Sequence, residues 1–497
     1  MGCPHKTIFI LCFVIVGFIG CDSSKNNKND LAMGTTEKVS DIATRPNILL
    51  ILCDDLGYAD VGFSGSKDIS TPNLDMLASN GTICTDAYMA HPFCGPSRAS
   101  LLAGRYAHKF GSQFNLPTEG DESKGIDVDE TFISRVLQKS GYYTGVIGKW
   151  HLGYQQQFHP NQRGFDDFYG FLGGGHNYFP EQFKEAYQRQ KANGRAFVWE
   201  YLRPLEHNGK EVEENEYVTD GLSREAVRFI SEASGKKDQP FFLYLSYNAP
   251  HTPLEAKEED LKLFSHIEDK KRRTYAAMVY AVDRGVKRIV EKLKETHQFD
   301  NTLIVFSSDN GGKTKAGANN FPLKEGKGSA YEGGFRVPTF LHWPNVVPAG
   351  KKFTYPISSL DFYPTFAGLA NAKIPEEKQL DGKDIWKPFL KNENPRPESP
   401  LFIMRHRKGY SDVAVRQDRW KALKVYQQKW RLFDIEADIE ENNDLSTQHP
   451  EILANLVRMG SRWSKTHVEP QWFHIEKEGE QWRADGMPNF DKTFALN

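Results

Sequence analysis

The sequence has few cysteines and almost no net charge. Of its 497 residues 6 are cysteine, and two of these, Cys3 and Cys12, lie in an apolar leader. The remaining four are too few for a disulfide framework in a chain of this length, so we expect Cys53 and Cys84 to be buried thiols. The formal net charge of −2 excludes an overall field that would attract a polyanion. Any anionic ligand must therefore be held by local Lys, Arg and His side chains, and nucleic-acid binding is not indicated.

The leader also lacks the length of a comfortable membrane span. Its apolar run, residues 8–19, is followed by FIGC ending at Cys21, which resembles a lipobox with Phe18 as an uncommon residue. We expect residues 1–21 to be a bacterial signal peptide of the lipoprotein type, with possible lipidation of Cys21 and membrane anchoring through that lipid. The protein would be exported, as a periplasmic or membrane-anchored lipoprotein, and simple secretion is the alternative. Residues 22–45 are polar and predict a disordered tether.

Short apolar runs followed by polar residues recur along the chain and predict buried parallel strands. The runs and the polar residues after them are 48–52 before Asp54 and Asp55, 143–147 before Lys149 and His151, 241–247 before Asn248 and His251, and 303–306 before Asp309 and Asn310. In an open parallel sheet the binding crevice lies outside the carboxyl ends of the strands. We therefore expect these polar residues to converge on one site.

Helical patterns separate the strands, and this alternation predicts an α/β domain over residues 46–392. The expected helices are 72–80 with Thr71 as a cap, 130–140 and 270–295. A Pro-rich stretch, residues 394–400, indicates a boundary. We expect a C-terminal subdomain over residues 393–497, with short antiparallel strands at 401–404, 420–425 and 430–435 and a helix at 450–464.

One cysteine lies in a setting that suits chemistry. In residues 91–105, HPFCGPSRASLLAGR, Pro96 fits the first position of a helix, which places Cys94 just before it. The positive end of the helix dipole and the charge of Arg98 favour an anion there, so Cys94 is a candidate nucleophile. A lone cysteine is more often a buried structural thiol.

Carboxylates supply a second candidate centre. Asp54 and Asp55 are adjacent at a strand end, where the backbone can turn both toward one cation. With Asp309 and Asn310 they form an all-oxygen set, which suits calcium or magnesium rather than zinc. Adjacent acidic residues alone would more often be a solvated turn.

Two longer sequence patterns favour the catalytic interpretation of these residues over the structural one. C-x-P-S-R-x-x-L-x-x-G-R runs from Cys94 to Arg105, and G-Y-x-T-x-x-x-G-K-x-x-H runs from Gly141 to His151. The chain thereby resembles type I, formylglycine-dependent sulfatases of the alkaline phosphatase-like superfamily, including bacterial polysaccharide sulfatases. The resemblance implies a sandwich with a large, mixed, mostly parallel central sheet flanked by helices, and a smaller C-terminal α+β subdomain with a short antiparallel sheet.

The resemblance also implies a modified nucleophile and a metal. A maturation enzyme would oxidise Cys94 to formylglycine, whose hydrated diol attacks sulfur. One calcium ion would be bound by Asp54, Asp55, Asp309, Asn310 and the modified Cys94.

Further roles carry over from the family to single residues. The resemblance implies that Arg98 and His151 orient the diol, that Lys149 and Lys327 hold the sulfate, and that His251 is the general acid. Asp309 could take the proton of the nucleophile, and His151 would help to expel sulfate. Lys327 is preferred to Lys324 because it stands five residues before Glu332, where a family block ends.

The substrate is less constrained by the sequence. Arg163, His176, Tyr178, Arg405 and His406 occupy loop-like stretches that could meet a charged sugar or be ordinary surface. We expect a sulfatase acting on a sulfated polysaccharide or its oligosaccharides, with algal glycans such as ulvan or carrageenan favoured over glycosaminoglycans. The alternatives are a phosphate or phosphonate ester hydrolase with the same metal site, and a non-catalytic glycan-binding lipoprotein in which Cys94 stays a thiol.

Overall fold

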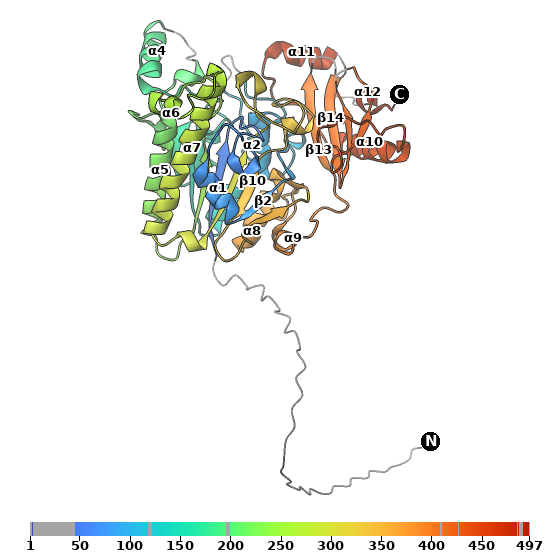
Figure 1. Cartoon of the computed structure of the whole chain (residues 1–497), viewed down its shortest axis with the longest axis horizontal. Helices are drawn as coiled ribbons and strands as arrows, with labels where there is room; N and C mark the ends of the chain where they lie inside the picture. The colour runs from blue at the N-terminus through green and yellow to red at the C-terminus, as the bar shows by residue number, and fades with distance from the viewer. Residues whose placement is uncertain are drawn as a thin grey trace. The chain divides into compact units, whose positions relative to one another are not determined.

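The apolar runs of the sequence form one mixed sheet at the centre of the fold (Figure 1). Among the described residues its strand order is β11-β2-β10-β9-β1-β8-β4-β5-β6-β7. The strands are β1 (Asn47–Cys53), β2 (Thr82–Cys84), β4 (Tyr143–Lys149), β5 (Asp167–Phe171), β6 (Glu206–His207), β7 (Lys210–Glu211), β8 (Phe241–Ser246), β9 (Thr302–Ser308), β10 (Thr339–His342) and β11 (Lys351–Phe353). The predicted strands are β1, β4, β8 and β9, each confirmed to within two residues at either end.

The computed structural model describes residue 2 and residues 45–117, 122–194, 199–407, 410–425, 427–484, 486 and 491–496. Cys21 and nearly all of the predicted signal peptide and tether lie outside these residues. Residues 44–497 form one compact unit. The predicted boundary between residues 392 and 393 stays a prediction. None of the described helices is both long and apolar enough to span a membrane.

The middle of the sheet is parallel and buried. β9, β1, β8, β4 and β5 pair in parallel, while β10 pairs antiparallel with β9. All residues of β1 and β8 are buried, because helices cover both faces of the sheet. This explains why these strands are continuous apolar runs in the sequence.

Helices form a layer on each face. On one face, Leu49 and Ile51 of β1 belong to a core shared with α1 (Pro72–Ser79), α5 (Val218–Ser234) and α7 (Lys270–Glu295). On the other, the ring of Phe242 in β8 lies 6.1 Å from that of Phe366 in α8 (Phe362–Leu369). The remaining helices of the main sheet region are α2 (Cys94–Ala103), α3 (Ile133–Lys139), α4 (Pro180–Ala192), α6 (Glu258–Leu263) and α9 (Trp386–Lys391), and β3 (Ala87–Tyr88) pairs with β12 (Ile357–Ser358).

The predicted helix bounds match the structure best where the amphipathic pattern is long. α7 covers the predicted range, residues 270–295. Thr71 does not cap α1 with its side chain; its hydroxyl accepts from the Gly62 N–H and donates to Asp75. α3 begins three residues later than predicted, because Phe132 is extended, with φ −83° and ψ 156°.

A second, antiparallel sheet follows in the order β13 (Leu401–Arg407), β14 (Tyr410–Gln417), β15 (Trp420–Lys424), β16 (Arg431–Asp434). α10 (Pro450–Ser464) packs on it and matches its predicted range, and α11 (Glu476–Ala484) and α12 (Asp491–Phe494) follow. The predicted small antiparallel sheet and its covering helix are confirmed. β14 was not predicted, because its buried Asp412 and Arg416 interrupt the apolar pattern.

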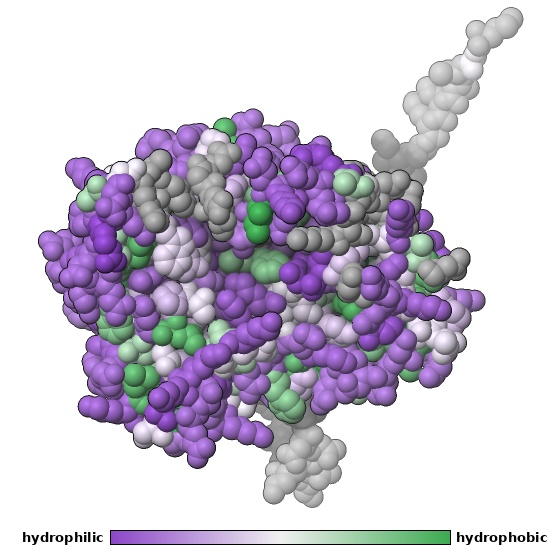
Figure 2. All heavy atoms as spheres, turned by 90° about the horizontal axis from the view of Figure 1, so that it is seen from above, coloured by the Kyte–Doolittle hydropathy of each residue, from purple (hydrophilic) through white to green (hydrophobic). Residues whose placement is uncertain are grey.

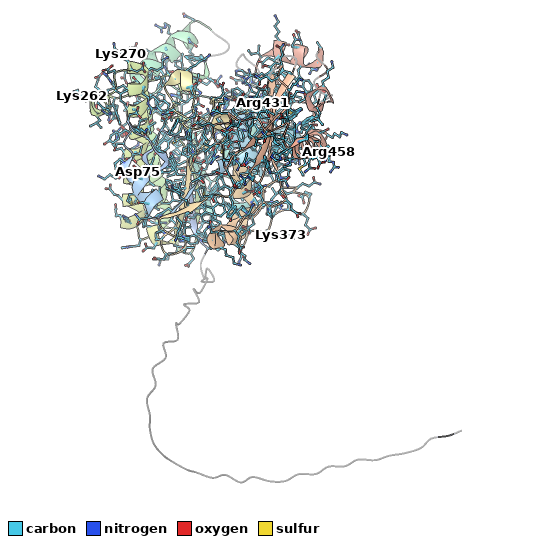
Figure 3. All side chains as sticks on the ribbon, turned by 45° about the vertical axis from the view of Figure 1, so that its right-hand side comes forward. Asp75, Lys262, Lys270, Lys373, Arg431 and Arg458 are labelled. Carbon is cyan, nitrogen blue, oxygen red and sulfur yellow. The ribbon has the colours of Figure 1, made fainter. Side chains whose placement is uncertain are left out.

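Charged side chains mostly lie on the outside. Lys262, Lys270 and Lys373 are exposed and lie at the outer edge of the fold (Figure 3). This is the usual place for lysine, so buried charges beside the central strands need a separate explanation.

Candidate active site

The carboxyl ends of the central strands meet at one edge of the sheet, as predicted. Asp54 and Asp55 follow β1, Lys149 ends β4, and Asp309 and Asn310 follow β9. These side chains are almost completely buried, with exposures of 2% or less. His151 and His251, which follow β4 and β8, are also buried. The structure thus brings together polar residues that are far apart in the sequence.

Cys94 lies at the N-terminus of α2. It is itself the first helical residue, with Phe93 as the extended N-cap, so Pro96 is the third helical position and not the first as predicted. The Cys94 Sγ lies 3.9 Å from the Lys327 Nζ and 3.8 Å from the Asn115 Oδ1. Asn115 also accepts a hydrogen bond of 2.9 Å from the Gly95 N–H. No sequence pattern singled out Asn115.

Three cations are paired with three carboxylates around this cysteine. Arg98 is fully buried, and its Nε and Nη2 lie 2.9 and 2.8 Å from the Asp309 Oδ2. The Lys149 Nζ lies 2.5 Å from the Asp54 Oδ2, and the Lys327 Nζ lies 2.6 Å from the Asp55 Oδ1. Although burial acts to raise it, Lys149 and His251 lower the pKa of Asp54. Lys324, by contrast, donates to the backbone of Glu441.

Two residues of the site have strained backbone conformations. Asp55 has a φ of 65° and His151 a φ of 62°, a region that costs other residues than glycine about 1–3 kcal/mol. The Asp55 N–H donates to the Asp309 Oδ1 at 3.2 Å, and the Tyr275 hydroxyl donates to the Asp55 carbonyl at 3.2 Å. These bonds hold the turn that directs both adjacent carboxylates into the site.

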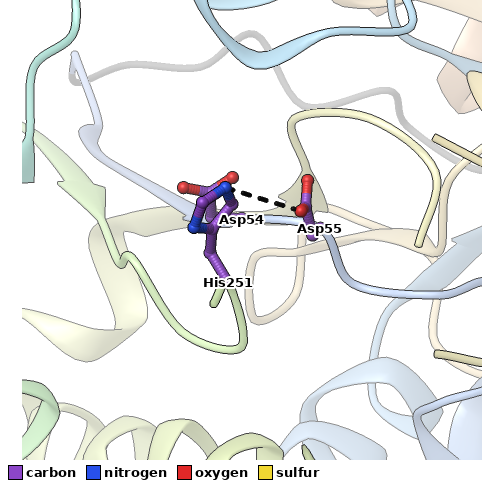
Figure 4. A group of neighbouring side chains, drawn as sticks. All are labelled: Asp54, Asp55 and His251. Carbon is purple, nitrogen blue, oxygen red and sulfur yellow. Dashed lines mark ion pairs between the residues drawn. The ribbon is translucent and has the colours of Figure 1, made fainter. Parts of the chain in front are cut away.

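The oxygen atoms of this centre fit a metal ion. Asp54 Oδ1, Asp55 Oδ2 and Asn310 Oδ1 are buried without a hydrogen-bond partner, an arrangement that is unfavourable unless something else binds them. Ligand atoms of Asp54, Cys94 and Asp309 all lie within 4.8 Å of one another, as do those of Asp54, Asp55 and His251 (Figure 4). These acidic residues could hold a hard divalent cation.

Both histidines are fixed by their surroundings. The His251 Nδ1 lies 2.7 Å from the Thr252 carbonyl, so it carries the proton, and Nε2 lies 3.7 Å from the Asp55 Oδ2 (Figure 4). Burial lowers the pKa of His251 to about 4, against the opposing effects of Asp54 and Asp55. His151 lies against Gly174, where a Cβ would be 2.7 Å from its Nε2.

The structure does not support three of the predicted sugar contacts, because their side chains bond to backbone carbonyls inside the fold. Arg163 donates to the carbonyls of Ile126, Asp127 and Glu130 at 2.7–3.0 Å. His176 is completely buried, and its two ring nitrogens lie 2.6 and 2.7 Å from backbone carbonyls. Tyr178 is equally buried, and its hydroxyl donates to the carbonyls of Asn248 and His251 at 2.8 Å.

The other two predicted contacts lie in β13. His406 is buried, with Nδ1 2.9 Å from the Ser411 Oγ, so the structure does not support it as a sugar contact either. Arg405 is half-buried; its guanidinium lies 4.7 Å from the centre of the Phe93 ring and donates to the Gly328 carbonyl. Since Phe93 precedes Cys94 and Gly328 follows Lys327, Arg405 stays a predicted substrate contact.

A glycine run that the sequence analysis passed over also supports the site. A Cβ on Gly173, Gly174 or Gly175 would lie 2.7 Å or less from Glu200, His151 or Tyr201 respectively. Glu200 accepts from the Gly174 N–H at 2.8 Å and from the Tyr154 hydroxyl. The three consecutive glycines were the only signal for this loop.

Comparison with known proteins decides the family. Residues 46–372 match the family model described as Sulfatase, and residues 326–462 match N-sulphoglucosamine sulphohydrolase, C-terminal. The chain belongs to the sulfatase family. It is a sulfuric ester hydrolase with the alkaline phosphatase-like fold, and the alternative of a non-catalytic glycan-binding protein falls away.

Relatives of this sulfatase include animal and bacterial proteins. Arylsulfatase J of Mus musculus is 31% identical over 474 residues, covering 86% of this chain and 77% of that protein. The crystal structure of Ps i-CgsB in complex with k-i-k-neocarrahexaose is 61% identical, with a TM-score of 0.90, and the match covers 91% of this chain and 100% of that one. PsFucS1 sulfatase from Pseudoalteromonas sp. is 25% identical, with a TM-score of 0.71 over 85% of this chain and 90% of that one.

Proposed function

We propose that this sulfatase removes sulfate esters from carrageenan or its oligosaccharides. The support is the 61% identity to Ps i-CgsB, whose structure contains a neocarrahexaose and whose whole chain is matched. This favours carrageenan over ulvan and over animal glycosaminoglycans. The observation that carries the chemistry is the set of buried cations and open carboxylate oxygens around Cys94.

The proposed nucleophile is the formylglycine that a maturation enzyme would make from Cys94. Cys94 is the first residue of a helix, so the positive end of the helix dipole favours negative charge there. Lys327 adds a full positive charge 3.9 Å from the Cys94 Sγ. A hydroxyl carried by this side chain would therefore attack sulfur from a position that stabilises an oxyanion.

The proposed metal is one calcium ion, held by Asp54, Asp55, Asp309, Asn310 and the modified Cys94. When bound, the ion would supply positive charge that polarises a sulfate oxygen and lowers the pKa of a bound hydroxyl. Calcium fits the oxygen set, and three of these oxygens are buried without a hydrogen-bond partner.

The other charged side chains would bind the sulfate, orient the nucleophile and transfer protons. Lys149 and Lys327 would bind the sulfate oxygens, and Arg98, fixed by Asp309, would orient the nucleophile with His151. Asp309 would accept the nucleophile's proton. An anionic ester beside the free Nε2 of His251 favours the protonated ring, because opposite charge raises the pKa of an imidazole. That proton would then pass to the leaving sugar oxygen.

The proposed location is outside the cytoplasm. The support is the leader, residues 1–21, and its Cys21, which suits a lipid anchor. A periplasmic or membrane-anchored lipoprotein would meet carrageenan oligosaccharides after they enter the cell envelope, and secretion is the alternative.

Sulfate release from a substrate panel tests the proposal. Enzyme produced together with a maturation enzyme would be incubated with carrageenan oligosaccharides, ulvan, chondroitin sulfate and an aryl phosphate matched to an aryl sulfate. We expect the highest kcat/KM on a carrageenan oligosaccharide and little turnover of the phosphate. Preference for ulvan or chondroitin sulfate would contradict the proposed substrate, and preference for the phosphate would favour a phosphate ester hydrolase.

A further inference from the structure

An exposed tryptophan lies at the start of the short helical turn Glu200–Leu202. Trp199 is the N-cap of this turn, and 49% of its surface is exposed. Among the described residues, Trp199 and Phe321 are the exposed large aromatic side chains. On the face shown in Figure 2, hydrophobic residues form only small patches among hydrophilic ones.

Trp199 is connected to the active site by stacked rings. Its ring stacks on that of Tyr201, with centroids 4.6 Å apart and an interplanar angle of 13°. The Tyr201 ring in turn meets the ring of His251 edge to face, with centroids 6.3 Å apart. The three rings therefore lead from the surface to the proposed general acid.

The glycine run holds this aromatic pair in place. Glu200, between the two aromatic residues, accepts from the Gly174 N–H at 2.8 Å, and the Asn177 N–H donates to the Tyr201 carbonyl at 3.2 Å. A Cβ on Gly175 would lie 2.3 Å from the Tyr201 ring. A side chain larger than hydrogen at position 175 would therefore displace the Tyr201 ring.

The chemistry of this pair suits a sugar ring. One face of a pyranose carries C–H bonds, which pack on the electron-rich face of an aromatic ring, while its hydroxyls point sideways to water. Burial, with Glu200 and Cys94 adding to it, raises the pKa of the Tyr201 hydroxyl, so this group stays a neutral donor. Ligand sites commonly combine such aromatic walls with a few polar groups.

We propose that the exposed face of Trp199, backed by Tyr201, is a stacking platform for a sugar ring of the glycan at the mouth of the active site. The inference rests on the proposed function, because it assumes a carbohydrate substrate. Since Tyr201 lies between Trp199 and His251, the ring on Trp199 is a neighbour of the one whose oxygen leaves. Trp199 would therefore select a glycan over a small sulfate ester.

Kinetics of Trp199→Ala on two substrates test the platform. With a neocarrahexaose we expect KM to rise roughly 10- to 100-fold while kcat changes little, because exposed tryptophans at binding centres typically contribute this much. On 4-nitrophenyl sulfate the loss in kcat/KM should be at least about 5-fold smaller. Trp199→Phe keeps an aromatic face and should recover most of the affinity. Leu263→Ala, a truncation of another exposed apolar side chain, is the control and should leave both activities unchanged.

The outcomes separate the platform from the proposed substrate. An unchanged KM for the oligosaccharide in Trp199→Ala would overturn the platform, and so would equal losses on both substrates, which would assign Trp199 to holding Glu200 and His151. If Trp199→Ala does not fold, Trp199→Phe with a 10-fold higher KM would contradict the platform as well. Wild-type enzyme that hydrolyses 4-nitrophenyl sulfate but no carrageenan oligosaccharide would instead contradict the proposed function, and the platform with it.

Discussion

Two clusters of buried charge in this sulfatase contain equal numbers of carboxylates and cations, but they pair their carboxylate oxygens differently. The first, the active-site cluster, contains three carboxylates and three cations: Asp54, Asp55, Asp309, Arg98, Lys149 and Lys327. The second, which we call the interface cluster, joins the small sheet to the main one and also contains three of each: Asp86, Glu332, Glu441, Arg336, Arg416 and Lys421.

The interface cluster pairs each of its carboxylates. The Lys421 Nζ lies 2.9 Å from Glu332 and 2.8 Å from Glu441, and Asp86 lies between Arg336 and Arg416. Lys421 and Arg416, from β15 and β14, thus fasten the small sheet. Burial of such pairs is tolerated only when the partners are complete.

The active-site cluster leaves oxygens open. Asp54 Oδ1, Asp55 Oδ2 and Asn310 Oδ1 have no hydrogen-bond partner, although Asp54 and Asp55 are each paired with a lysine through their other oxygen. The comparison teaches that buried charge alone does not mark a site. What distinguishes the active site is the combination of buried oxygens that lack a hydrogen-bond partner with strained backbone conformations at Asp55 and His151.

Removing the nucleophile should have the largest effect on rate and a small effect on stability. Cys94→Ala should lose all measurable sulfate release, because no other side chain can carry the attacking oxygen. Its free energy of unfolding should stay within about 1 kcal/mol of wild type, since only the small terminal group of one side chain at a helix end is lost. Cys84→Ala, which changes a buried thiol in β2, is the matched control and should keep its turnover. Retained sulfate release by Cys94→Ala would rule out this nucleophile.

Replacing His251 should reduce the rate on sugar sulfates much more than the rate on aryl sulfates. A sugar alkoxide leaves poorly without a proton, whereas a phenolate leaves readily, and general-acid assistance is typically worth about 100- to 10,000-fold. His251→Ala should therefore lose far more kcat on a carrageenan oligosaccharide than on 4-nitrophenyl sulfate. Equal losses on both would assign His251 to sulfate binding, with Lys327 the next candidate for the acid.

Breaking the interface cluster should affect stability instead of chemistry. Lys421→Met leaves Glu332 and Glu441 without their shared cation, which should cost about 3–5 kcal/mol of unfolding free energy in urea denaturation. The triple change Lys421→Met, Glu332→Gln and Glu441→Gln removes the uncompensated charge and should recover part of this loss. A cost below about 1 kcal/mol for Lys421→Met would show that the interface cluster does not fasten the small sheet.

The sequence predicts the strands and the site edge well for a physical reason. Parallel strands buried on both faces, such as β1 and β9, are continuous apolar runs, and the polar residues directly after them must lie at the carboxyl edge. The two family patterns in the sequence also indicated that Cys94 and His151 belong to the active site.

Other features depend on contacts that the sequence does not contain. β14 is buried although it carries Asp412 and Arg416, because Arg416 is paired with the distant Asp86 and Asp412 with Arg407 of β13. Arg163 was predicted as a sugar contact because its three carbonyl partners could not be foreseen. Trp199 follows no periodic pattern, and only the fold places it near His251.

Calcium binding to the active-site cluster tests the central claim most directly. Wild-type enzyme would be stripped with a chelator, titrated with Ca²⁺ and followed by calorimetry and thermal unfolding, beside Asp54→Asn and the interface variant Glu441→Gln. We predict one calcium per wild-type chain with a higher Tm on binding, the same stoichiometry for Glu441→Gln, and loss of binding in Asp54→Asn. Wild-type enzyme that releases sulfate at full rate with no bound divalent ion, or equal calcium binding by Asp54→Asn, would contradict the claim that the open oxygens form a metal site.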